Sequence, residues 1–200
     1  AHINNLASKI SKNLFYINRV KNFLSHDALR TLYFALIQSY LTYGLLAWGN
    51  ANSVSKLLKL QKRAMRILNN KAYRSHTDPL FRTERILKIS DMYKLYSTLF
   101  AHDYIYDKLP LSFRNFYPDP RRRLSARRRN DIHLGKPRTA FSRNSFYYNT
   151  PFIWNCQQEH VKSIINRTEL KNLVFEHILN GYQVAVLCSN LHCTDCHNRP

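Results

Sequence analysis

Glycine and acidic residues are both scarce in this chain of 200 residues. It has four glycines, and no two of them build a glycine-rich phosphate loop. Its twelve Asp and Glu residues are scattered, whereas two-metal catalysis needs carboxylates that cluster around the ions. The motifs His-Glu-x-x-His and Gly-x-Ser-x-Gly are also missing. These absences exclude nucleotide folds of the Rossmann and Walker type and leave no visible catalytic residues.

Cysteine is scarce too, and its positions do not suggest a disulfide framework. Three of the four cysteines (Cys188, Cys193 and Cys196) lie at the C-terminus, while Cys156 stands alone. The Cys193 to His197 segment matches the haem-attachment pattern, and with Cys188 and His192 it offers enough ligands for zinc. The C-x4-C-x2-C-H spacing is not that of a standard zinc ribbon. We therefore expect no haem or zinc, no metal site in this chain, and a disordered tail over residues 188–200.

Charge is absent from residues 31–55, so a membrane-spanning helix has to be considered. Gln38, Ser39 and Thr42 make the stretch too polar for lipid, and basic residues flank both of its ends. We therefore expect a helix at the centre of a protein core, and no membrane partner.

Apolar residues recur with helical periodicity through the first half of the chain. The pattern predicts helices over residues 2–24, 26–48 and 54–68, and a fourth that begins at Ser90. Aromatic residues and turn formers between Phe141 and Trp154 favour a short β-hairpin. A closing amphipathic helix over 161–179 should stop at Gly181.

These patterns predict a mainly α fold in four parts. Residues 1–108 form a helical bundle, and residues 109–140 form a basic linker or arm rich in proline and arginine. Residues 141–187 carry the β-hairpin and the amphipathic helix, and residues 188–200 form the Cys/His tail. The chain starts with a helix already under way, which suggests a fragment of a longer protein.

Positive charge is in large excess, with 31 Lys and Arg against twelve acids and a net charge of +19. Five of these cations share one face of the predicted third helix, because they are spaced three or four residues apart. No acid lies between Asp27 and Asp78, so this face has no counter-charge nearby in the sequence. Such a stripe can be ordinary solvated surface, but we favour contact with nucleic-acid phosphates. Its residues are Lys56, Lys59, Lys62, Arg63 and Arg66.

A second basic cluster lies in the predicted linker. Arginine binds phosphate oxygens in a bidentate manner, and nearby aromatic residues could stack on bases. The alternative is a nuclear-localisation signal, and the two uses are compatible. We predict an intracellular, nuclear location and phosphate contacts by Arg121, Arg122, Arg123, Arg127, Arg128, Arg129, Lys136 and Arg138, with Phe116, Tyr117, Phe141, Phe146, Tyr147 and Tyr148 as stacking surfaces.

A succession of short motifs resembles the region that follows the palm in non-LTR retrotransposon reverse transcriptases of the LINE, jockey-like type. The resemblance covers roughly residues 2–180, and the terminal cysteines and histidines lack the zinc-knuckle spacing of the family. The motifs are His2-Ile3, Lys9-Ile10, Leu32-Tyr33, Tyr43-Gly44, Trp48-Gly49, Leu60-Gln61, Arg63-Ala64 with Arg66, Lys136-Pro137-Arg138-Thr139, Phe146 and Trp154-Asn155.

The resemblance implies a helical, thumb-like region of an RNA-directed DNA polymerase that holds the template and primer. The palm and fingers, with the catalytic carboxylates and their Mg²⁺ ions, would lie upstream of these residues. The expected partners are thus an RNA or DNA template-primer and the upstream polymerase domains, with no cofactor or small-molecule ligand in this chain. The alternative is a decayed element or an adaptor module that acts only through protein-protein contacts.

Overall fold

The computed structural model describes residues 1–117 and 131–182, and every regular element in these ranges is helical. The mainly α prediction is therefore confirmed. The elements are α1 (His2–Val20), α2 (His26–Tyr33), the π-helical η1 (Phe34–Gln38), α3 (Ser39–Thr42), α4 (Leu45–Trp48), α5 (Val54–Leu68), α6 (Asp78–Thr83), α7 (Ile89–Ile105), the 3₁₀ helix η2 (Leu111–Phe113), α8 (Ala140–Asn144), α9 (Phe146–Asn155), α10 (Glu159–Lys162) and α11 (Arg167–Asn180).

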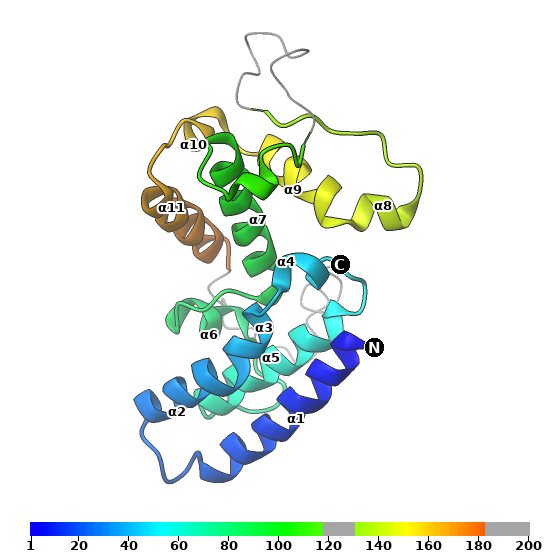
Figure 1. The fold of residues 1–200 in the computed structure, drawn as a ribbon. Coiled ribbons are helices and arrows are strands. Elements are labelled where there is room, and N and C mark those ends of the chain that lie inside the picture. The colour runs from blue at the N-terminus through cyan, green and yellow to red at the C-terminus, as the bar shows by residue number, and fades with distance from the viewer. Residues whose placement is uncertain (118–130, 183–200) are drawn as a thin grey trace.

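The helices form two lobes (Figure 1). The first lobe contains α1 to α6, and the second contains α8 to α11 packed on α7. The long helix α7 also contacts α4 and α5, so it belongs to the cores of both lobes. No helix among the described residues combines the length and apolar character that a membrane span requires.

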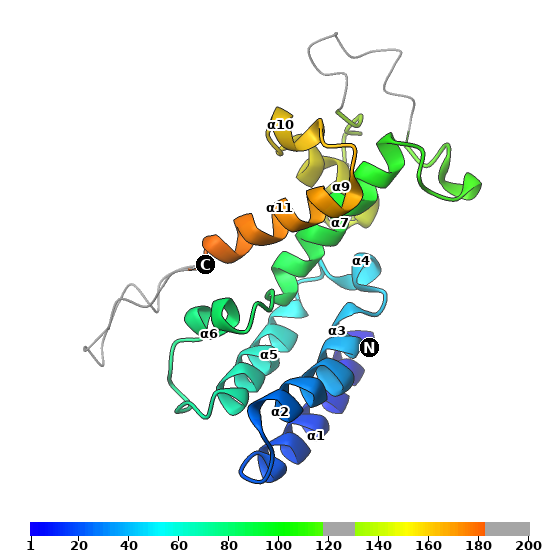
Figure 2. The ribbon, with the colours of Figure 1, turned by 90° about the vertical axis from the view of Figure 1, so that its left-hand side faces the viewer.

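Helices α1 and α5 lie side by side and run in the same direction (Figure 2). Near their first turns the Lys56 ammonium donates to the Asn4 side-chain oxygen at 3.1 Å. Near their ends the Lys21 ammonium donates to the side-chain oxygen of Asn70 at 3.2 Å. The predicted apolar stripe of α1 is confirmed as far as Ile17, but Leu24 lies beyond the helix and is exposed. Burial of this stripe holds α1 on the lobe.

The second helical segment runs from α2 through η1 to α3 and lies at the surface. Ser25 begins it as predicted, because its hydroxyl accepts a hydrogen bond from the Ala28 amide. Tyr33, Ile37 and Leu41 are buried along one side, while Phe34 on another side is 38% exposed. The prediction that this helix forms the centre of the core is therefore wrong. One apolar face is enough to attach it to α1 and α5.

The central helix is instead α7, which has ten buried residues. It begins at Ile89, one residue before the predicted Ser90, and no side chain of its own segment caps it. The cap comes from α5, where the Gln61 side-chain oxygen accepts a hydrogen bond from the Ile89 amide at 2.9 Å. A side chain distant in sequence thus satisfies one of the free amides at the helix start.

Residues 141–154 lie in the helices α8 and α9, which meet at Ser145, so the predicted β-hairpin is wrong. Ser145 begins α9, and its hydroxyl accepts a hydrogen bond from the Tyr148 amide. Thr150 and Trp154, four residues apart, are buried on the side of α9 that faces α7. Pro151 suggested a turn, but it lies inside the helix. Tertiary packing on α7 therefore outweighs the local turn signals.

The closing segment is divided into two helices rather than one. The Asn166 side chain begins α11 by accepting hydrogen bonds from the amides of Thr168 and Glu169. An Asn side chain that caps a new helix separates it from the preceding α10. Helix α11 ends at Asn180, immediately before Gly181, as the sequence predicts.

Candidate nucleic-acid interface

The basic stripe predicted on the third helix lies on the outer face of α5. The inner face carries buried Leu57, Ala64 and Met65, which fixes the rotation of the helix about its axis. Of the stripe, Lys56, Lys59 and Arg63 are exposed and Lys62 and Arg66 are half-buried. The structure therefore brings all five cations to one rigid element, over about 15 Å of helix length at 1.5 Å per residue.

Among residues 1–117 and 131–182 the stripe has no acidic partner. Lys56 donates to the uncharged Asn4, and no salt bridge within residues 1–117 and 131–182 involves any of the five cations. The Arg66 guanidinium donates through Nε to the Ser75 carbonyl oxygen at 2.9 Å and lies 5.9 Å from the centre of the Tyr73 ring. Partial burial lowers the pKa of Arg66 from its usual value. An arginine nevertheless keeps its charge at neutral pH.

The surrounding surface is basic as well. The first 77 residues contain twelve Lys and Arg but a single acid, Asp27. Of the acids that follow, Asp78 pairs with Lys88, and the buried Glu84 pairs with Arg30, which is one of these twelve cations. The first lobe therefore keeps a large excess of positive charge, and its positive potential should extend over about one Debye length, roughly 8 Å at physiological salt.

The second predicted cluster is placed only in part. Arg121, Arg122, Arg123, Arg127, Arg128 and Arg129 lie outside the described residues. Lys136 and Arg138 are exposed. They belong to the segment 131–139, which leads into α8 and runs beside the second lobe, apart from α5 (Figure 1). The structure does not bring these two residues to the stripe.

The chain is attached to the second lobe on both sides of the arginines at 121–129, which we call the arginine cluster. Before it, Tyr117 is buried, and its carbonyl oxygen accepts a hydrogen bond from the Tyr104 hydroxyl at 2.9 Å. After it, the Asn155 side chain binds both backbone groups of Ile132, at 3.0 Å from the amide and 2.8 Å from the carbonyl oxygen. The Trp154-Asn155 motif thus has a structural role, since Trp154 is fully buried and Asn155 anchors the segment that begins at residue 131.

An ion cluster around the buried Lys162 also fixes the segment that begins at residue 131. The Lys162 ammonium lies 2.7 Å from an Asp131 carboxylate oxygen and 3.2 Å from Glu159. Burial alone would lower the pKa of Lys162, but the hydrogen bonds to these two carboxylates raise it above its usual value. Lys162 therefore stays charged, and its charge stabilises the fold through these ion pairs rather than binding a ligand.

Most of the aromatic residues predicted to stack on bases are engaged within the second lobe, so that prediction is wrong for them. Phe116 and Phe146 pack against Phe100 of α7, with ring centres 6.0 and 4.8 Å away. Tyr117 is buried, Tyr147 packs on Phe116 and Tyr117, and Tyr148 stacks on Phe152. Of that set Phe141 is the most open, with 88% of its surface exposed, and Tyr147 is 44% exposed beside its ring contacts.

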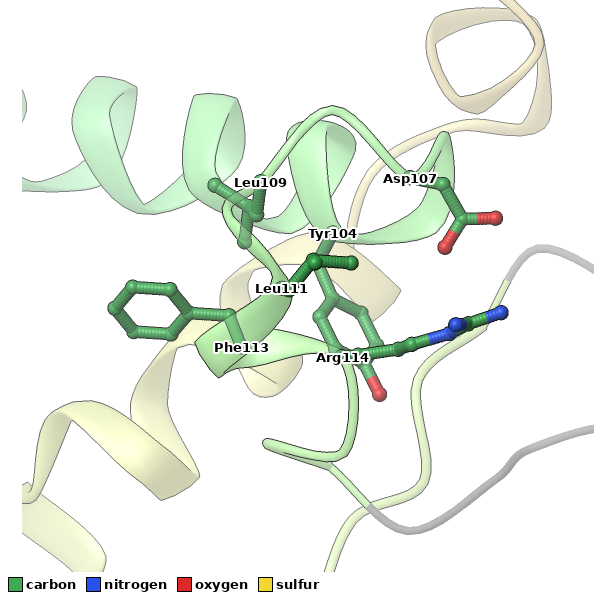
Figure 3. Close-up of a pocket in the computed structure, with 6 residues that line it drawn as sticks. All are labelled: Tyr104, Asp107, Leu109, Leu111, Phe113 and Arg114. Carbon is green, nitrogen blue, oxygen red and sulfur yellow. The ribbon is translucent and has the colours of Figure 1, made fainter.

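An open pocket of about 290 Å³ lies where α7 ends and η2 begins (Figure 3). Leu109, Leu111 and Phe113 form its apolar side, and Asp107 and Arg114 are its charged groups. A single carboxylate beside one arginine does not provide a catalytic set. Within the described ranges, His, Cys, Asp and Glu side chains nowhere gather in threes as a metal site would need. Cys188, Cys193 and Cys196 lie outside these ranges.

Two features of the first lobe, near the basic stripe, were not predicted from the sequence. Gln61 is completely buried and links α5 to α7, although glutamine is mostly found at protein surfaces. Exposed aromatic rings also gather where α1 and α5 end, with Tyr73 80% exposed beside Arg66. The signal available in the sequence was the position of Phe15 and Tyr16 outside the apolar stripe of α1.

Compared with family models, curated proteins and solved structures, the chain matches none.

Proposed function

We propose that this chain is the helical, thumb-like region of a non-LTR retrotransposon reverse transcriptase, and that it holds a template-primer duplex by its phosphate backbone. The observation that supports this proposal best is the outer face of α5, with five cations on one rigid helix and no acidic partner among the described residues. The order of motifs in the sequence supports the assignment to this class of polymerase.

Cations fixed on a packed helix suit phosphate binding for two reasons. Little further ordering of the protein is needed, so less conformational entropy is lost when they bind than with a flexible arm. Each neutralised phosphate also releases condensed counterions, which makes binding favourable and dependent on salt. Contacts of this kind set the position of the duplex without reading its sequence.

Polymerisation itself would depend on the upstream palm of the proposed polymerase. The described acids do not gather as a pair of Mg²⁺ ions would require, so no catalytic step is assigned to them. The arginines of residues 121–129 would add phosphate contacts from outside the described ranges. Each of these should contribute less than a stripe cation if the segment has to be ordered on binding.

The test is a fluorescence-anisotropy titration of a labelled hairpin duplex at several salt concentrations. The variant replaces four stripe residues (Lys56→Gln, Lys59→Gln, Lys62→Gln and Arg63→Gln) and leaves Arg66, which contacts Ser75 and Tyr73. Since each phosphate contact on double-stranded DNA adds about 0.9 to the slope of log K against log salt, this slope should fall by roughly three to four.

A matched control removes the same charge from other surfaces. It carries Arg82→Gln, Arg114→Gln, Arg143→Gln and Lys171→Gln, four exposed residues with no ion pair among the described residues. Its slope should change by less than one, and both variants should keep the helical circular dichroism of the parent. Equal losses in the two variants would show that net charge alone attracts the duplex. An unchanged slope in the stripe variant would favour the adaptor alternative.

A further inference from the structure

Four exposed aromatic residues lie at the end of the first lobe where α1 and α5 finish. Phe15, Tyr16, Phe23 and Tyr73 are 53%, 61%, 86% and 80% exposed, respectively. Phe15 and Tyr16 belong to the last turns of α1, while Phe23 and Tyr73 follow α1 and α5 closely in the chain. We call these four residues the aromatic end.

The two helix ends are held together, so these rings occupy one end of the lobe. Lys21 donates to the side chain of Asn70, which connects the residues just after α1 to those just after α5. The rings of Phe15 and Tyr16 meet edge to face with centres 5.8 Å apart. The Arg19 guanidinium lies 5.1 Å from the centre of the Phe15 ring. Part of the aromatic end is therefore ordered by its own contacts rather than by a covering element.

The basic stripe of α5 runs directly into the aromatic end. Arg66, its last member, is fixed by the Ser75 carbonyl oxygen and lies against the Tyr73 ring. Lys71 and Arg74 are exposed on either side of Tyr73 in the chain. A phosphate chain that follows α5 would therefore meet further cations and an open ring immediately beyond the helix.

Aromatic rings among cations suit unpaired nucleotides better than a duplex. Bases inside a duplex are covered by their neighbours, whereas each unpaired base has a free face that can stack on a protein ring. A groove for a single strand combines these two elements, cations that follow the backbone and rings that accept successive bases. Aromatic and arginine side chains are also enriched at protein interfaces, so what favours a nucleic acid here is the continuity of these rings with the basic stripe of α5.

We propose that the aromatic end binds the unpaired nucleotides of a strand that continues out of the duplex held along α5. Tyr73 stacks on the first of these bases, and Phe15 and Tyr16 provide a second stacking surface. This inference rests on the proposed function, because it takes the direction of the strand from the stripe.

The test compares a blunt hairpin duplex with the same duplex carrying a single-stranded overhang of about six nucleotides, a length within the range that such grooves bind. Overhangs are attached at the 3′ end or at the 5′ end, so that either strand direction is sampled. The full chain should bind one of the overhang duplexes at least about tenfold more tightly than the blunt duplex, as base stacking on a ring predicts.

The key variant is Tyr73→Leu, and the matched control is Tyr43→Leu. Tyr43 is also 80% exposed, but it lies at the opposite end of the lobe, where its carbonyl oxygen accepts a hydrogen bond from Trp48 and the Trp48 ring lies against His2. Tyr73→Leu should lose most of the preference for the overhang and keep its affinity for the blunt duplex. Tyr43→Leu should change neither, and Tyr73→Phe should restore the preference because it keeps the ring.

A second readout detects stacking directly. 2-Aminopurine placed in the overhang should be quenched when the parent chain binds and should stay bright with Tyr73→Leu at saturating protein. Equal affinity of the parent chain for blunt and overhang duplexes, or equal losses for Tyr73→Leu and Tyr43→Leu, would overturn the inference. Neither result affects the stripe, whose own test is the salt slope on the blunt duplex. The failures of the two proposals are thus distinguishable.

Discussion

Gln61→Leu should destabilise this protein strongly although it places an apolar side chain in an apolar core. The Gln61 amide group donates to the Leu87 carbonyl oxygen at 2.9 Å and to the Tyr33 hydroxyl at 3.1 Å. Its side-chain oxygen accepts from the Ile89 amide at 2.9 Å. All three bonds are buried, so a leucine of similar size would leave the backbone groups of Leu87 and Ile89 without these partners.

The expected loss follows from the number of groups left unpaired. Each buried polar group that loses its partner costs about 1 to 3 kcal/mol, so Gln61→Leu should lower the free energy of unfolding by about 2 to 6 kcal/mol. Tyr33→Phe is the matched control within the network. It removes one hydroxyl, which accepts a hydrogen bond from Gln61 and donates one to the Gln38 side-chain oxygen at 2.9 Å. The loss of these two bonds should cost about 1 to 3 kcal/mol, while Gln61 keeps both of its backbone bonds.

Urea denaturation followed by far-ultraviolet circular dichroism measures both changes. The double variant Gln61→Leu with Tyr33→Phe should lose less than the sum of the single losses, because the two residues share one hydrogen bond. A loss below about 1 kcal/mol for Gln61→Leu would refute the reasoning, because the orphaned groups would then have found other partners.

Two further predictions concern pH and glycine. Burial raises the pKa of Tyr33 above its usual 10.0, so the unfolded chain releases this proton first and the free energy of unfolding should fall as pH rises above about 10. Urea titrations across alkaline pH should show a decline of up to about 1.4 kcal/mol per pH unit from this residue, and a shallower one in Tyr33→Phe. Gly49→Asn should lower the melting temperature more than Gly44→Asn. A Cβ at Gly49 would stand 2.6 Å from the Leu45 carbonyl oxygen and from the Tyr93 ring, whereas Gly44 has room and a left-handed φ of 61° that Asn tolerates.

Helices with a clear apolar stripe were predictable from the sequence. In α1 and α5 the buried residues repeat every three or four positions, so a single periodicity fixes both the helix and its inner face. The outer face of α5 follows directly, because the cations occupy the positions that the buried apolar residues leave free. The basic stripe is therefore the part of the candidate site that sequence reasoning placed correctly on one helix.

Features that depend on tertiary contacts were not predictable in the same way. Helix α9 contains Pro151 and several aromatic residues, and it is helical because Thr150 and Trp154 pack on α7. The aromatic residues near the arginine cluster looked available for bases, but Phe116 and Tyr117 fill the second lobe. A window of sequence cannot distinguish an aromatic residue that packs on a distant helix from one that faces solvent.

The contact between α1 and α5 suggests how the protein can be handled. Apolar side chains and hydrogen bonds from Lys56 to Asn4 and from Lys21 to Asn70 join these two helices, and no salt bridge between them occurs among the described residues. Concentrated salt screens ionic contacts and leaves apolar packing in place or strengthens it. Washing with molar salt should therefore strip nucleic acid carried over from the host cell while the first lobe remains folded, so that binding can be measured afterwards on clean protein.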